Sequence, residues 1–295
     1  MSEDMKPVWA WGMARTASSG WSAVLRRGDN ALWVHEINEW AGADFPRDLG
    51  DLIRGGWTRQ IEELAERRGW FRERAHRPDT LTMGLPIPTP ERVVGIGLNF
   101  RAHAADLKAV VPEEPATFLK PRNTWVPSGA RVMLPHASAR VTAEAEIALI
   151  FGRDAYNLTS REAADAIWGA MAVLDLTAED VLQKNPRFLT RAKGYDGFFV
   201  MAPWAVPWEE ADYRRVRRIE MRVDGDTRTQ DTTDHMIYDF DRVVALVAED
   251  VHVGATAVLS TGTPGAAAIQ PGNRIAARAE GLYDAFFETV GFQKG

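Results

Sequence analysis

The sequence predicts an α+β protein with a small N-terminal domain and a larger second domain. Strand-like runs and stretches of helical spacing both occur along the 295 residues, and an apolar fraction of 45% can supply a sizeable core. A chain of this length fits one large domain or a small domain followed by a large one. Alternating prolines at 86, 88 and 90 favour an extended connection. We therefore place the domains at residues 1–88 and 89–295.

Composition excludes several classes of protein. The net charge of −6 argues against nucleic acid as the main partner, and the absence of cysteine excludes disulfides and thiolate chemistry. The basic run at Arg214, Arg215, Arg217 and Arg218 lacks interleaved aromatic residues, so we interpret it as a solvated face. No signal-peptide pattern and no membrane-spanning apolar run are present. We expect a cytoplasmic protein with neither a membrane nor a nucleic-acid partner.

The N-terminal domain is expected to combine short strands with helices. Residues 8–45 read as short strands, with a turn-rich hairpin connection at 26–30. Leucine and isoleucine recur at helical spacing over residues 47–75, which predicts helices. The glycines at 55 and 56 are expected to divide that stretch in two.

The second domain begins with a strand at residues 93–100 that enters a glycine-containing turn. Phe100 stands where a dinucleotide-binding fingerprint would have its third glycine, so a Rossmann interpretation is poor. Further along, residues 159–162 fit a capping box at a helix start, and 224–225 is a favoured hairpin turn. Residues 239–250 have the spacing of a helix.

Three carboxylates are the strongest indication of chemistry. Glu144 and Glu146 lie two apart at the head of the apolar run 141–150, so on a strand they point to one face and repel unless a cation or proton lies between them. Asp175 ends a second apolar run, where a buried carboxylate is costly unless it is paired or binds metal. Oxygen ligands without His or Cys suit Mg²⁺, Mn²⁺ or Ca²⁺ rather than Zn²⁺. The alternative is that both glutamates line the wet face of a half-buried strand.

Two other segments are candidates for a reactive site. His103 and Asp106 would share one face of a helical turn, where a histidine beside a carboxylate can act as a general base; a plain surface contact is the alternative. Residues 258–265 predict a strand ending in a turn rich in backbone N–H groups and hydroxyls, which can hold an oxyanion or a carboxylate.

In order and spacing, these segments resemble the fumarylacetoacetate hydrolase family over about residues 92–290. The resemblance is carried by residues 93–103, 118–121, 144–146, Asp175 with Thr177, Ala178 and Asp180, 192–193, 236–237 and 261–264. It implies a mixed β-roll or β-sandwich catalytic domain, usually a homodimer, behind a small α+β N-terminal domain. It also implies a divalent metal, Mg²⁺ or a similar ion, that chelates a small-molecule 1,3-dicarbonyl or 2-oxo acid. Carbon–carbon bond hydrolysis is the usual outcome, and some members decarboxylate oxaloacetate or isomerise dienoates.

The same resemblance assigns roles to particular residues. Glu144, Glu146 and Asp175 would be the metal ligands. His103 with Asp106 would activate water, although the family usually has Glu where this chain has the shorter Asp106. Lys193 and Thr263 would hold the oxyanion, and Gly262 of the same turn would contact the substrate.

The resemblance also shows departures in the residues that would bind the substrate. Glu179 and Leu182 stand where the family usually has an Arg and a Gln that bind the substrate's carboxylate or carbonyl. An anion in place of a cation disfavours a carboxylate substrate. The leading hypothesis is a metal-dependent hydrolase or decarboxylase acting through an enolate on a substrate other than a simple acylpyruvate. An isomerase, lyase or cyclase of specialised metabolism and a non-catalytic binding protein are the alternatives.

Overall fold

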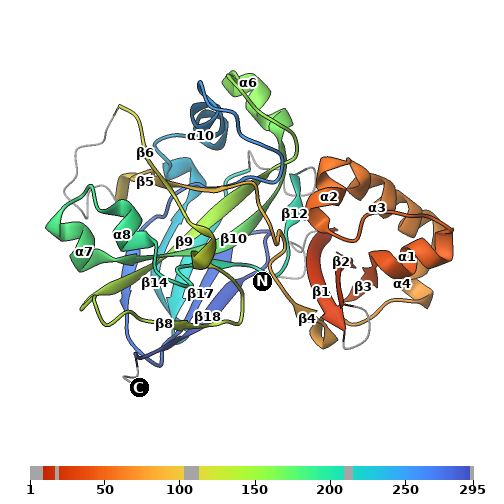
Figure 1. Ribbon diagram of the computed structural model, residues 1–295, viewed down its shortest axis with the longest axis horizontal. Coiled ribbons are helices and arrows are strands. Elements are labelled where there is room, and N and C mark those ends of the chain that lie inside the picture. The colour runs from red at the N-terminus through yellow and green to blue at the C-terminus, as the bar shows by residue number, and fades with distance from the viewer. Residues whose placement is uncertain (1–8, 17–19, 103–112, 209–214, 293–295) are drawn as a thin grey trace.

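The computed structural model describes residues 9–16, 20–102, 113–208 and 215–292 (Figure 1). These residues form three sheets, two of which belong to the larger second part of the chain. Figure 1 shows the N-terminal part, in red and orange, beside the remainder in yellow to blue. The α+β class is confirmed. The domain boundary at residue 88 stays a prediction, since the isolated bridge between Trp11 and Ala205 joins the two parts.

The N-terminal part is a four-stranded sheet with helices packed against it, in the strand order β3-β2-β1-β4. Its elements are β1 (Ala10–Thr16), β2 (Gly20–Arg27), β3 (Asn30–Trp33), α1 (Val34–Ala41), α2 (Leu49–Arg54), α3 (Trp57–Arg68), α4 (Trp70–Glu73) and β4 (Thr82–Met83). The predicted β2–β3 hairpin is confirmed by the pairing of Arg27 with Asn30, and the glycines at 55 and 56 separate α2 from α3. The prediction of strands throughout 8–45 was wrong for α1. There Val34 and Ile37 bury one face of a helix that ends at Gly42 in the left-handed conformation.

The second part is built from a nine-stranded sheet and a five-stranded sheet. The nine-stranded sheet has the order β6-β5-β15-β9-β10-β11-β7, with β12 on β10 and β16 on β9; the five-stranded sheet has the order β14-β13-β17-β18-β8. The strands are β5 (Val93–Gly97), β6 (Ala116–Leu119), β7 (Trp125–Pro127), β8 (Arg131–Met133), β9 (Val141–Phe151), β10 (Ile167–Ala178), β11 (Phe199–Met201), β12 (Val206–Pro207), β13 (Arg218–Val223), β14 (Asp226–Thr232), β15 (Val258–Ser260), β16 (Ala266–Ile269), β17 (Arg274–Ala279) and β18 (Ala285–Val290). The helices are α6 (Ser160–Ala163), α7 (Glu179–Lys184), α8 (Leu189–Lys193) and α10 (Phe240–Val247).

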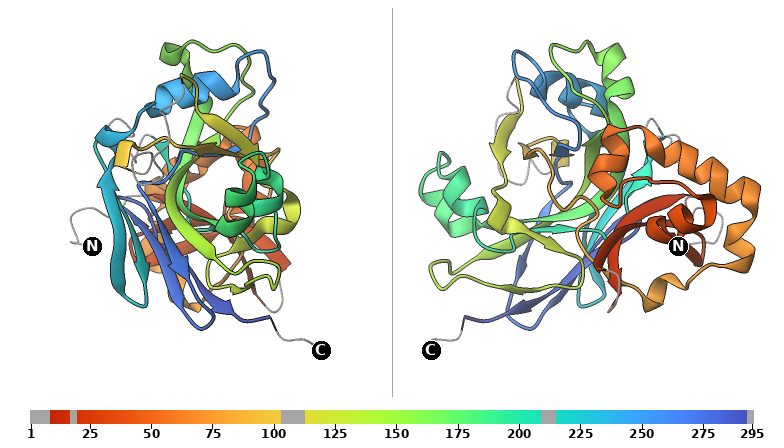
Figure 2. Two further views of the ribbon diagram at one scale, coloured as in Figure 1. Left: turned by 90° about the vertical axis from the view of Figure 1, so that its left-hand side faces the viewer. Right: turned by 45° about the vertical axis from the view of Figure 1, so that its right-hand side comes forward.

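The antiparallel pair β9 and β10 lies at the centre of this part. All eleven residues of β9 are buried, because β10, β15 and β16 flank it and β13 and β17 lie against it. Figure 2 shows the sheets curling around the long strands, as the β-roll prediction requires. Strands covered on both faces read as near-continuous apolar runs, which is the pattern of residues 141–150. The predicted capping box at Thr159 and Glu162 and the predicted strand β15 are both present.

One prediction about the surface was wrong. Arg217 belongs to the basic run interpreted as a solvated face, yet it is buried and its guanidinium donates to the carbonyl oxygen of Glu280. Arg215 and Arg218 are exposed as expected, and Arg214 lies outside the described residues. Among the helices of the described residues, none has the length and apolar character needed to span a membrane.

Candidate metal centre and active site

The register of β9 and β10 brings the three predicted carboxylates together. Asp175 lies directly opposite Glu144 in the antiparallel pair, and residues directly opposite share a face of the sheet. Glu146, two residues further along β9, points to that face as well. One oxygen from each carboxylate lies within 4.8 Å of the others, and all three side chains are buried. We call Glu144, Glu146 and Asp175 the carboxylate triad; among the described residues it is the only such group.

Two buried lysines balance part of the triad's charge. The ammonium of Lys193, at the end of α8, lies 2.9 Å from Glu144 Oε2 and 2.5 Å from Asp175 Oδ2. The ammonium of Lys120, which follows β6, donates to Asp175 Oδ1 at 2.7 Å and to the carbonyl oxygen of Lys193 at 2.6 Å. Each lysine is therefore held by hydrogen bonds that also fix Asp175.

Glu146 has neutral donors instead of a lysine. The hydroxyl of Ser260 and the backbone N–H of Gly262 both donate to Glu146 Oε2, at 2.6 and 2.8 Å. Gly262 has φ +97°, a conformation that favours glycine, and a Cβ there would lie 2.8 Å from the Cβ of Asn99. Asn99 in turn donates to the carbonyl oxygen of Thr261 at 2.8 Å. The turn after β15 is thus fixed so that its N–H points at the glutamate.

The pKa values follow from this arrangement. Burial, and then the neighbouring Asp175 and Glu144, raise the pKa of Glu146 to about 8. Burial acts to raise the pKa of Asp175 too, but Lys120 and Lys193 together hold it below its usual value. Burial opposes the charge on Lys193, yet the adjacent Asp175 and Glu144 raise its pKa. Lys120 has Asp175 as its ion-pair partner, and burial lowers its pKa to about 8.

This donor set fits a divalent cation. With both lysines protonated, two of the three carboxylates are balanced and the third requires a proton or a metal ion. The ammonium of Lys193, bound between Glu144 and Asp175, shows that these two carboxylates together attract a cation. Glu144, Glu146 and Asp175 supply only hard oxygen ligands, as Mg²⁺ and Mn²⁺ prefer. The wet-face alternative fails, since the exposed fractions of Glu144 and Glu146 are 8% and 2%.

Glu144 and Glu146 of the triad line a cavity of about 460 Å³, which we call the triad cavity. Its walls come from β5, β6, the start of β9, the end of β10, α7, α8 and the start of β16. The lining residues are Ile96, Gly97, Leu98, Ala116, Phe118, Arg140, Thr142, Glu144, Glu146, Thr177, Glu179, Leu182, Pro186, Leu189, Lys193, Thr263 and Ala266. The cavity is therefore mainly apolar, with charged groups at the triad and at the Arg140–Glu179 pair.

The structure places most of the other predicted site residues at this cavity. Glu179, Leu182 and Thr263 line it. The hydroxyl of Thr263 donates to the carbonyl oxygen of Gly265 at 2.9 Å, and the Gly262 N–H is engaged by Glu146. Glu179 is ion-paired to Arg140, with 2.6 Å between Nε and Oε2.

His103 and Asp106 lie outside the described residues, so their predicted role as a general base stays a prediction. Sequence reasoning missed Lys120, Ser260 and Arg140. Lys120 could have been found as the one charged residue of the Phe-Leu-Lys-Pro segment at 118–121, which already carried the family resemblance. Arg140 could have been found by counting back in twos from Glu144 along the strand.

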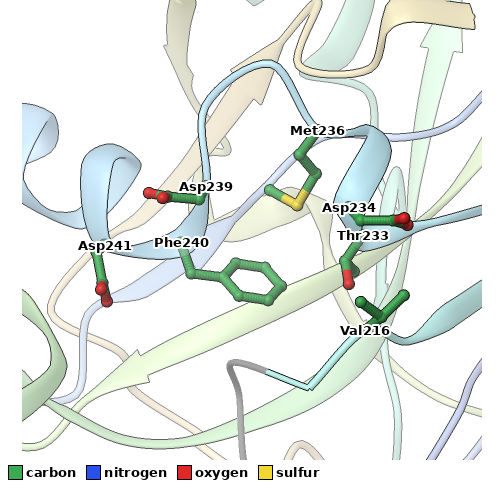
Figure 3. A pocket seen from close by; sticks show the side chains of 7 residues that line it. All are labelled: Val216, Thr233, Asp234, Met236, Asp239, Phe240 and Asp241. Carbon is green, nitrogen blue, oxygen red and sulfur yellow. The ribbon is translucent and has the colours of Figure 1, made fainter.

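A second cavity, of about 340 Å³, lies near the start of α10. It is lined by Val216, Thr233, Asp234, Met236, Asp239, Phe240 and Asp241. Figure 3 shows Met236 and Phe240 directed into this pocket and its carboxylates pointing in different directions. Asp239 also caps α10 by accepting from the Arg242 N–H at 2.8 Å. The carboxylates of this second cavity therefore do not converge as those of the triad do.

Curled sheets and a buried carboxylate triad beside an apolar cavity are features of a small-molecule enzyme with an acidic site suited to a divalent cation. The fumarylacetoacetate (FAA) hydrolase C-terminal family model matches residues 92–286. The chain belongs to the fumarylacetoacetate hydrolase family, as the sequence resemblance indicated. Hydrolases, isomerases, decarboxylases and tautomerases all occur among its members, so the chain is an enzyme by family.

Individual proteins are also similar to this chain in sequence. A protein of Archaeoglobus fulgidus is 34% identical over 187 residues, which cover 63% of this chain and 73% of that protein. The mitochondrial oxaloacetate tautomerase FAHD1 of Arabidopsis thaliana is 31% identical over 204 residues, 67% of this chain and 90% of its own.

Solved structures share the fold. The structure of fumarylacetoacetate hydrolase from Exiguobacterium antarcticum superposes with a TM-score of 0.80 at 21% identity, covering 96% of this chain and 100% of that one. The structure of fumarylpyruvate hydrolase from Pseudomonas aeruginosa, in complex with Mn²⁺ and pyruvate, has a TM-score of 0.65 at 23% identity and covers 68% and 90%.

Proposed function

We propose that this protein is a Mg²⁺- or Mn²⁺-dependent enzyme that acts on an enolisable 1,3-dicarbonyl or 2-oxo acid. The outcome would be carbon–carbon bond hydrolysis or decarboxylation, both of which leave an enolate. The observation that carries the proposal is the buried carboxylate triad, two of whose members, Glu144 and Glu146, line the triad cavity. A bound divalent ion would supply a Lewis acid for the two oxygens of the substrate. The Mn²⁺ and pyruvate of the Pseudomonas aeruginosa hydrolase support both the metal and the substrate class.

The chain's own residues would divide the remaining work. Glu144, Glu146 and Asp175 would hold the ion. Lys193 lines the cavity, and its raised pKa keeps it protonated at neutral pH, so it would donate a hydrogen bond to developing negative charge instead of accepting a proton. Thr263 would donate a second hydrogen bond once its hydroxyl turns away from the carbonyl oxygen of Gly265. Leu98, Phe118 and Leu189 would exclude water from the reacting atoms.

We further propose His103, with Asp106 as its partner, as the base that activates water. Hydrolysis requires such a group, because the two lysines and the bound ion would engage the carboxylates of the triad and Lys193 is protonated. His103→Ala should abolish hydrolysis while leaving metal-induced stabilisation unchanged, and Asp106→Ala should lower the rate less. If either variant changed the metal-induced stabilisation, its loss of activity would be explained by metal binding, and the proposal that the residue serves as the base would be contradicted.

Tautomerisation or isomerisation on the same site is the second candidate. It is supported by the Arabidopsis thaliana tautomerase, which matches at 31% identity over 90% of its length. The same residues would serve, because moving a proton next to a carbonyl also passes through an enolate. We also propose a homodimer, as expected from the sequence resemblance; light scattering of the purified chain would test it.

The first experiment follows oxaloacetate and an acylpyruvate by absorbance and by product analysis. Chelator-treated protein is assayed with and without Mg²⁺ or Mn²⁺, alongside Glu146→Ala and Glu146→Gln. Glu288→Gln, which removes an exposed carboxylate on β18, is the matched control. Metal-dependent turnover in the parent and the control, lost in both Glu146 variants, supports the proposal, and the product separates cleavage from tautomerisation. Turnover that survives both chelation and Glu146→Gln contradicts it.

A further inference from the structure

One face of the β9–β10 pair carries a row of polar pairs that leads away from the triad. Glu144 lies opposite Asp175, and two threonines face each other at the next position on the same face. The backbone N–H of Glu179 donates to the carbonyl oxygen of Arg140 at 2.9 Å, which extends this register beyond the strand ends. Side chains two residues apart share a face, so Arg140 and Glu179 end the row, about 13 Å along the strand from Glu144.

Arg140 and Glu179, the pair at the end of this row, line the triad cavity. Arg140 Nε lies 2.6 Å from Glu179 Oε2, and Gln183 Nε2 donates to Glu179 Oε1 at 2.9 Å. Both oxygens of Glu179 therefore have a donor. The guanidinium of Arg140 carries five N–H donors. Among the described residues, only its Nε forms a hydrogen bond with another side chain, that of Glu179. Its terminal nitrogens remain for a ligand, and both residues line the triad cavity.

Charge decides which ligand suits this end of the cavity. The exposed fractions of the Arg140 and Glu179 side chains are 54% and 21%, so the pair adds little to stability. As a pair it is neutral. It offers hydrogen-bond donors, but a carboxylate placed there would also meet the carboxylate of Glu179. An uncharged acceptor gains the hydrogen bonds without that repulsion.

Resting on the proposed function, we propose that the substrate carries an uncharged hydrogen-bond acceptor, such as an amide or ketone carbonyl, at the end away from the metal. Arg140 binds this acceptor. Glu179 is a positioning residue that orients Arg140 and disfavours an anionic end. Between the two polar ends, Phe118, Leu182 and Leu189 line the cavity and accommodate an apolar linker.

The test uses three 2,4-dioxo acids with one chain length, long enough to reach from the triad to Arg140, about 13 Å. They end in a methyl group, a primary amide or a carboxylate. Parent, Arg140→Met and Glu179→Gln are compared by kcat/KM with Mg²⁺ or Mn²⁺. Arg278→Met is the matched control, because Arg278 forms a similarly exposed pair with Asp284 (2.9 Å) away from this cavity.

The parent should prefer the amide to the methyl compound by about tenfold, the size of one hydrogen bond to a charged group. Arg140→Met should bring that ratio close to one by raising the KM of the amide compound. Glu179→Gln should improve the carboxylate compound about tenfold. Arg278→Met should change none of these ratios. Equal use of all three compounds by the parent, or a preference that survives Arg140→Met, overturns the proposal.

The failure of the proposed function looks different. In that case, none of the three compounds is converted by the metal-loaded parent. The melting temperature is then measured with each compound and the metal. A larger shift with the amide than with the methyl compound, lost in Arg140→Met, still supports the Arg140 site, whereas equal shifts overturn it.

Discussion

Replacing Lys120 tests whether the buried charges of the site are balanced as described. Lys120 is fully buried, and its ammonium is bonded to Asp175 and to the backbone of Lys193. Burial lowers its pKa to about 8 even beside Asp175, so the ion pair does not fully offset the desolvation of the ammonium. Lys120→Met would leave Asp175 with Lys193 alone, and Lys193 must also balance Glu144.

The expected magnitude follows from breaking a buried pair on one side. Without metal, Lys120→Met should lower the free energy of unfolding by about 3–5 kcal/mol. At about 2–4 °C per kcal/mol for a domain of this size, the melting temperature should fall by roughly 6–20 °C. The double variant Lys120→Met with Asp175→Leu removes one charge of each sign. It should recover to within about 1 kcal/mol of the parent or exceed it, because apolar replacements of a buried pair avoid the desolvation.

The assay is urea unfolding at pH 7 in the presence of a chelator, followed by tryptophan fluorescence. Lys184→Met, at an exposed position in α7, is the control and should change the free energy of unfolding by less than about 0.5 kcal/mol. A loss below about 1 kcal/mol for Lys120→Met would refute the balance described here. So would a double variant whose loss equals the sum of the two single losses.

Four further predictions concern the metal and its ligands. Mg²⁺ or Mn²⁺ added at about 100 times its Kd to chelator-treated protein should stabilise the fold by about 2.7 kcal/mol, and an unchanged melting curve contradicts the site. Because the pKa of Glu146 is raised to about 8, metal binding below that pH must release its proton, so affinity should rise about tenfold per pH unit up to pH 8 and then level off; calorimetry in buffers of different ionisation enthalpy measures the proton. In metal-free protein, the folded state holds the proton of Glu146 between pH 4.5 and about pH 8 while the unfolded state has lost it, so the free energy of unfolding should fall as the pH rises through this window. A fall of the same size in Glu146→Gln would contradict the raised pKa of Glu146. Ser260→Ala should weaken metal binding about tenfold by removing a donor to Glu146, whereas Ser128→Ala, outside the cavity, should not.

Much of the fold and the centre of the site could be predicted from local pattern. The period of two places Glu144 and Glu146 on one face, and the lengths of the two apolar runs imply paired strands. The cost of burying Asp175 unpaired indicated a binding site before any geometry was known. These inferences depend on neighbours in sequence or on one strand pairing, which a sequence reveals well.

The parts that were missed depend on contacts between distant segments. Lys120 reaches Asp175 across 55 positions, and Ser260 reaches Glu146 across 114, so no local period announces either contact. Arg217 looked like a surface residue because its neighbours are arginines, yet the carbonyl of Glu280 provides a partner from another strand connection. The helix Val34–Ala41 follows a strand without a break, and its residues Val34 and Ile37 have high strand propensity.

The row of side-chain pairs along β9 and β10 has an evolutionary consequence. The residues between the pairs, such as Ala143 and Ala145, face the opposite way and are fully buried. Substitutions at Arg140 and Glu179, which lie just beyond the ends of β9 and β10, therefore need not disturb the core or the carboxylates further along the strands. A family that keeps its reaction chemistry at one end of such a row can diversify its substrates at the other by single point mutations.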